Sequence, residues 1–101
     1  MTKKHWIIIS RFYATTWKLN DMITVIAEYF KYLFGVYPLV EQIDRDITIL
    51  LIKGKPVLCL LNEIANNKML ISIFVNRNHL NKIYFSAIYN FLKILSVIKA
   101  R

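Results

Sequence analysis

The segment Val75–Lys82 holds the residues of this sequence that are best suited to bind an anion. It reads Val-Asn-Arg-Asn-His-Leu-Asn-Lys, between the apolar run Met69–Val75 and an apolar stretch that begins at Ile83. Arg can bind phosphate oxygens through two parallel hydrogen bonds, and Asn or His can contact sugars and base edges. The candidate phosphate-binding and RNA-binding residues here are Asn76, Arg77, Asn78, His79 and Lys82.

A structural interpretation explains the same residues. The segment follows a predicted strand and precedes a predicted helix, so Asn78 would cap the helix while Arg77 and Lys82 are solvated. The two interpretations are compatible, because a helix N-terminus has unpaired backbone N–H groups that favour anions. Both stay open at this point.

Other cations extend the candidate RNA-binding set beyond this segment. Lys53 and Lys55 flank Gly54 in a predicted hairpin turn, Lys68 lies in the next turn, and Lys3, Lys4 and Arg11 lie near the N-terminus. The formal net charge is +8, and all six acids lie between Asp21 and Glu63. Basic ends that meet in the fold would form one positive face for a phosphate-rich partner. General solubility charge is the alternative.

Catalytic and metal-binding groups are few. The two histidines have no metal-ligand spacing, and Lys53-Gly54-Lys55 lacks the repeated glycines of a phosphate loop. The carboxylates Glu41, Asp44 and Asp46 cluster, but Asp44-Arg45-Asp46 precedes a predicted strand and is typical of a solvated turn. Cys59 is the only cysteine, and its apolar neighbours favour a buried thiol over a catalytic nucleophile. A single cysteine forms no internal disulfide, which favours a reducing compartment. We expect no enzyme, cofactor, metal site or small-molecule substrate.

Hydrophobic periodicity predicts the elements that must position these residues. A strand is predicted over His5–Tyr13, and a helix through Phe34, with Asn20–Asp21 as its N-cap and Gly35 as its C-cap. The strands that follow are predicted over Asp46–Ile52, Pro56–Leu61 and Met69–Val75, and a turn over Glu63–Lys68. A second amphipathic helix begins near Leu80, and Ser96–Arg101 forms its end or a short last strand.

These elements predict one α+β domain over residues 1–101. Two helical stripes that cover one face of a mostly antiparallel sheet form a two-layer sandwich. The aromatic residues Phe12, Tyr13 and Tyr37, with Trp6 and Trp17, belong more often to a core than to a base-stacking surface.

High hydrophobicity requires a test for membrane spans. Apolar residues make up 56% of the chain, with a mean hydropathy of +0.40. A spanning helix needs about 18 or more consecutive apolar residues, and charged residues or Asn interrupt every run here before that length. We therefore expect no transmembrane segment, and we assign the excess apolar surface to a core and a docking face.

Several local patterns resemble the small-subunit ribosomal protein S-ten family. They are the strand Trp6–Phe12, the helix from Leu19-Asn-Asp-Met to Gly35, the approach Pro38–Ile52, the strand and turn Leu70–Ile83, and the helix Tyr84–Leu95. The resemblance implies a ferredoxin-like sandwich that binds ribosomal RNA. The chain departs from the family in a less basic hairpin, in the apolar arm Pro56–Leu61, which could contact a neighbouring protein, and in a closing strand limited to Ser96–Arg101.

The resemblance implies a structural constituent of a divergent small ribosomal subunit, which binds ribosomal RNA and neighbouring ribosomal proteins. A composition typical of an AT-rich genome, without a presequence, favours an organelle-encoded protein of the mitochondrial matrix ribosome, with the cytoplasm as second choice. Two alternatives remain open. They are an accessory subunit of a membrane-bound mitochondrial respiratory complex, and a double-stranded RNA-binding-like module.

Overall fold

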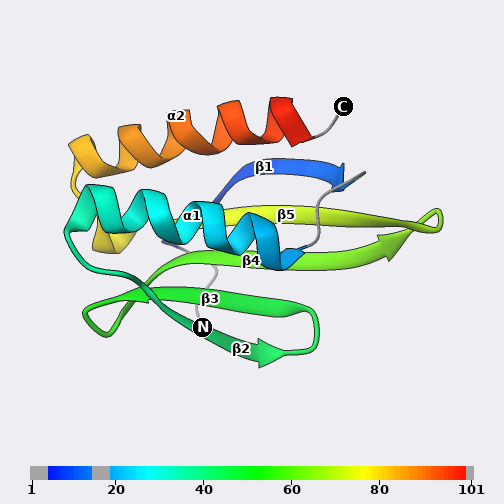
Figure 1. Cartoon of the computed structure of the whole chain (residues 1–101), viewed down its shortest axis with the longest axis horizontal. Helices are drawn as coiled ribbons and strands as arrows, with labels where there is room; N and C mark the ends of the chain where they lie inside the picture. The colour runs from blue at the N-terminus through cyan, green and yellow to red at the C-terminus, as the bar shows by residue number, and fades with distance from the viewer. Residues whose placement is uncertain (1–4, 15–18, 100–101) are drawn as a thin grey trace.

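The computed structural model describes residues 5–14 and 19–99, and Figure 1 shows how its elements are arranged. In chain order the elements are β1 (Trp6–Ala14), α1 (Leu19–Phe34), β2 (Leu39–Asp44), β3 (Ile47–Ile52), β4 (Lys55–Ala65), β5 (Lys68–Asn76), the 3-10 turn η2 (Arg77–His79) and α2 (Lys82–Lys99).

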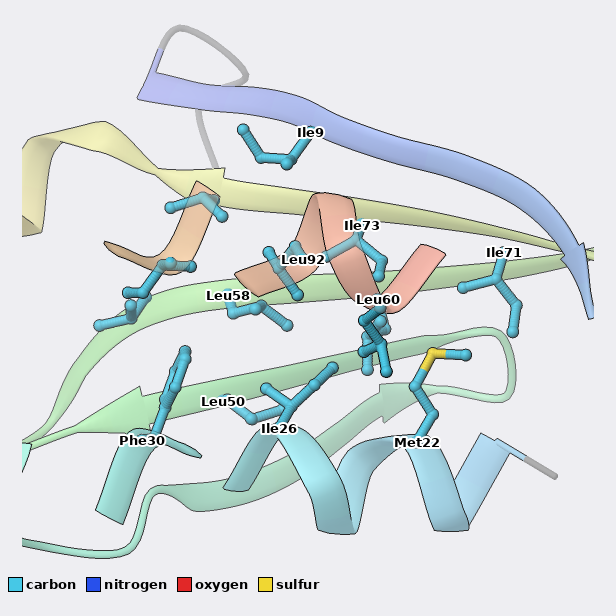
Figure 2. Close-up of a cluster of buried hydrophobic side chains, with 14 of the residues drawn as sticks. Ile9, Met22, Ile26, Phe30, Leu50, Leu58, Leu60, Ile71, Ile73 and Leu92 are labelled. Atoms are coloured by element: carbon cyan, nitrogen blue, oxygen red, sulfur yellow. The ribbon is translucent and has the colours of Figure 1, made fainter. Parts of the chain in front are cut away.

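Within the described ranges the strands form one five-stranded sheet in the order β1-β5-β4-β3-β2, and every neighbouring pair is antiparallel. Both helices pack on one face of this sheet. Figure 2 shows Met22, Ile26 and Phe30 of α1 pointing at the sheet residues. Ile88, Leu92 and Leu95 of α2 complete the same core. The predicted two-layer α+β sandwich is confirmed.

The order of connection differs from the ferredoxin-like one that the resemblance implied. The strand β2 was not predicted, because all six of its residues are exposed and show no clear alternation of apolar and polar types. At the other end, α2 runs to Lys99, so Ser96–Lys99 is helical and forms no closing strand. Ala100 and Arg101 lie outside the described residues.

The apolar arm Pro56–Leu61 lies in the middle of the sheet. It opens β4, which pairs with β3 on one side and β5 on the other, and Val57, Leu58, Cys59 and Leu60 are buried. The expectation that this arm contacts a neighbouring protein is therefore wrong for Val57–Leu60, whose side chains are buried within the chain, while Pro56 and Leu61 are half-buried. The strand also continues through Glu63 to Ala65, and only Asn66–Asn67 forms the turn to β5.

The turns and helix ends follow from backbone conformation. Gly35 has φ of +80° and its N–H donates to Lys31 O at 2.9 Å, which confirms the predicted C-terminal end of α1. The predicted N-cap is wrong, because α1 already includes Asn20 and Asp21 in its first turn. Lys53 and Gly54 have φ of 52° and 80°, so they form the two-residue turn between β3 and β4.

Candidate nucleic-acid interface

The turn η2 is built by Asn76. This residue is 6% exposed, and its Oδ1 accepts a hydrogen bond from Asn78 N at 3.0 Å. The backbone is then held in a 3-10 turn, and Arg77, Asn78 and His79 are exposed. Asn76 therefore positions the turn, and the three residues that follow present their side chains to solvent.

The N-cap of α2 is Asn81. Its Oδ1 accepts a hydrogen bond from Tyr84 N at 2.9 Å, and Phe85 N donates to its backbone oxygen at 2.9 Å. The sequence interpretation in which Asn78 caps this helix is wrong, because η2 intervenes and delays the helix until Lys82. Asn78 instead donates its N–H to Asn76.

The sheet brings the β3–β4 turn next to η2. The pairing of Leu58 with Val75 places the beginning of β4 beside the end of β5, and η2 contacts β4. Five predicted cationic or titratable side chains thus share one end of the molecule, at the left of Figure 1. We call this group the basic end: Lys53, Lys55, Arg77, His79 and Lys82.

Two hollows meet at Asn81 within the basic end. The first has a volume of about 300 Å³, and Lys53, Lys55, His79 and Asn81 supply its polar rim. The second has a volume of about 490 Å³ and is lined by residues that include Arg77, Lys82 and Ser86. Among the described residues, no carboxylate lines either hollow. The surroundings therefore favour a bound anion.

Not all predicted RNA-binding residues join the basic end. Arg11 lies in the middle of β1 and pairs with Glu63 at 3.9 Å, with both side chains about half exposed. Lys68 begins β5 at the opposite end of β4 from Lys55, and its Nζ lies 5.9 Å from the Tyr13 ring centroid. Lys3 and Lys4 lie outside the described residues.

The predicted aromatic residues have different settings. Phe12 is in the core, Trp6 is half-buried, and Trp17 lies outside the described residues. Tyr13 and Tyr37 are 37% and 58% exposed. The Tyr37 hydroxyl donates to Glu28 Oε1 at 3.1 Å, and this hydrogen bond raises the pKa of Tyr37. Neither exposed ring lines a hollow of the basic end.

The aromatic residues that do line the first hollow are Phe34 and Tyr84. Both lie on helices that the sequence predicted, but their contact depends on how α1 and α2 pack, which the sequence did not predict. Asn81 was also missed as a cap. Its signal was present in the sequence, since an Asn directly before a helical apolar stripe is a preferred N-cap.

Catalytic chemistry gains no support from the other polar groups. Burial raises the pKa of the Cys59 thiol, which lowers the fraction of reactive thiolate. In the part of the chain that the structure describes, no three His, Cys, Asp or Glu side chains gather as a metal site would require. No helix of residues 19–99 is long and apolar enough to cross a membrane. The site is suited to hold an anion by charge and hydrogen bonds.

Comparison with family models, with curated proteins and with solved structures finds no match for this chain.

Proposed function

We propose that this protein is an RNA-binding structural constituent of a ribonucleoprotein, namely a divergent small ribosomal subunit of the mitochondrial type. The observation that carries the RNA-binding part is the basic end, where two turns from distant parts of the chain place cations around hollows without a carboxylate in their described linings. The assignment to a ribosomal particle rests on the resemblance to the S-ten family. That family has a closing strand, and in this chain the helix α2 takes its place. RNA binding therefore stands on the basic end and not on that resemblance.

Exposed apolar side chains support a second contact, with a neighbouring protein. Five of them lie along and just before β2, the edge strand of the sheet, and are 38% to 60% exposed. We call this group the β2 edge patch: Val36, Tyr37, Leu39, Val40 and Ile43. Exposed apolar side chains on an edge strand suit a protein contact, because the strand also offers its unpaired backbone groups to a partner.

A charge-matched pair of variants tests the RNA-binding surface. The double variant Arg77→Ala/Lys82→Ala removes two cations of the basic end, and the control Arg45→Ala/Lys93→Ala removes two exposed cations elsewhere. Fluorescence anisotropy with a labelled RNA hairpin is measured over a series of salt concentrations. We expect the first variant to bind about fivefold more weakly, with the log–log salt slope reduced by about 1 to 2, because phosphate contacts are lost.

The control variant should keep the affinity to within about twofold, because it retains the basic end. Equal weakening by the two variants would mean that net charge alone causes binding. No binding by the unchanged protein at low salt would refute the RNA-binding proposal.

Cofractionation distinguishes the assembly from its main rival. The exposed apolar surface also suits an accessory subunit of a membrane-bound respiratory complex. A ribosomal constituent sediments with particles that ribonuclease disperses. A respiratory subunit instead remains with membranes until detergent releases it, and that result would contradict the ribosomal assignment.

A further inference from the structure

The first hollow of the basic end has two chemically distinct parts. Its inner wall is apolar and is formed by Phe34, Ile52, Val57 and Tyr84. Ile52 and Val57 are 8% and 2% exposed, so that part of the wall belongs to the edge of the core. The polar rim of lysines, His79 and Asn81 lies around this wall. A ligand that fits both parts has a flat apolar group joined to an anion.

The aromatic part of the wall is suited to a nucleobase. The rings of Phe34 and Tyr84 are half-buried, with centroids 4.9 Å apart and planes at 56° to each other. Half-buried aromatic rings bind unpaired bases by stacking or edge contacts, with little preference for sequence. The volume of about 300 Å³ lies at the small end of ligand pockets and suits one nucleotide unit.

The rim supplies the groups for a phosphate. Lys53 and Lys55 flank the turn residue Gly54, and both side chains are exposed. Asn81 Oδ1 already accepts from Tyr84 N, which leaves its amide N–H₂ group as a donor on the rim. We infer that this hollow holds one unpaired nucleotide, with its base against Phe34 and Tyr84 and its phosphate at Lys53 and Lys55. The inference deepens the proposed RNA-binding function and rests on it.

A comparison of single-stranded with duplex RNA tests the inference in the full-length protein. The variant Tyr84→Leu removes one ring but keeps an apolar side chain, and Lys82→Ala removes a cation that lies outside this hollow. We expect Tyr84→Leu to weaken binding of single-stranded oligouridylate about fivefold and to leave duplex binding unchanged, because paired bases cannot enter the hollow. Lys82→Ala should weaken both.

A second measurement does not depend on a substituted ring. Uridine 5′-monophosphate, uridine and inorganic phosphate are titrated separately into the ¹⁵N-labelled protein. The monophosphate should shift the amide resonances of Lys53, Lys55 and Tyr84 and should bind more tightly than either fragment. The turn variant Lys53→Ala/Lys55→Ala should weaken this binding about fivefold, and Lys93→Ala should not change it.

The results separate failure of this inference from failure of the RNA-binding proposal. If RNA binds through Arg77 and Lys82 but Tyr84→Leu affects both RNA forms equally or neither, the nucleotide inference is overturned alone. The nucleotide inference is also overturned if inorganic phosphate binds as tightly as the monophosphate. It is overturned too if the amide resonances of the residues that line the hollow do not shift. If no RNA binds but the monophosphate enters the hollow, the site takes a free nucleotide and the RNA-binding proposal fails.

Discussion

At the residue scale, three asparagines near one turn have different structural roles, which their shared residue type does not distinguish. Asn76 closes η2, Asn81 caps α2, and Asn78 contributes its backbone N–H to the first of these. The sequence predicted a helix cap in this segment but assigned it to the wrong Asn. A 3-10 turn of three residues is too short to show a hydrophobic repeat, so the sequence did not reveal that it precedes the helix. The type of residue was predictable, and its position was not.

The capping assignment predicts different costs for two similar substitutions. Asn81→Ala removes the side-chain acceptor of Tyr84 N, so we expect it to lower the free energy of unfolding by about 1 kcal/mol. Asn78→Ala keeps the backbone N–H that donates to Asn76, and should change stability by less than about 0.5 kcal/mol. Urea denaturation followed by circular dichroism measures both. An equal or larger loss for Asn78→Ala would contradict the assignment.

At the element scale, hydrophobic patterns predicted most of the elements but not the order of the strands in the sheet. The stripes of α1 and α2 and the strands β1, β3 and β5 were predicted close to their observed bounds. The run Pro56–Leu61 was predicted as the second arm of a hairpin with Asp46–Ile52, and β4 pairs with β3 as predicted. Its pairing with β5 on the other side was not predicted. An uninterrupted apolar run is typical of a strand buried on both faces, and only the sheet order shows that β4 is the central strand.

The place of β4 in the interior gives a prediction within one strand. Leu58 is fully buried, whereas Ile64 on the same strand is 76% exposed. Leu58→Ala should lower the free energy of unfolding by about 2 to 5 kcal/mol, because it leaves a cavity in the core. Ile64→Ala should change it by less than about 0.5 kcal/mol. Thermal or urea unfolding provides the comparison, and a mild effect of Leu58→Ala would place this arm outside the core.

At the scale of the whole molecule, the basic end arises from the long-range register of the strands. The sequence suggested one positive face if two basic terminal regions meet, and the pairing of β1 with β5 makes the described parts of these regions neighbours. Lys3, Lys4 and Arg101 lie outside the described residues. In the structure, the turn at Lys53–Lys55 joins the segment Arg77–Lys82 because β4 pairs with β5. The proximity of these two segments depends on the order of the strands in the sheet, which local sequence patterns do not predict. Each cation was therefore predictable as a candidate, and their grouping was not.

The apolar surface of the whole molecule gives the last prediction. If the β2 edge patch docks on a partner, the isolated chain exposes it and should self-associate through it. Leu39→Lys/Ile43→Lys places charge on residues that are 60% and 59% exposed, so it should reduce self-association without lowering the midpoint of thermal unfolding. The control Ile83→Lys/Ile94→Lys adds the same charge at exposed positions on α2. Sedimentation velocity over a range of concentrations measures the effect. If both variants reduce self-association equally, the effect comes from the added charge and not from the β2 edge patch, because the control leaves the edge strand unchanged.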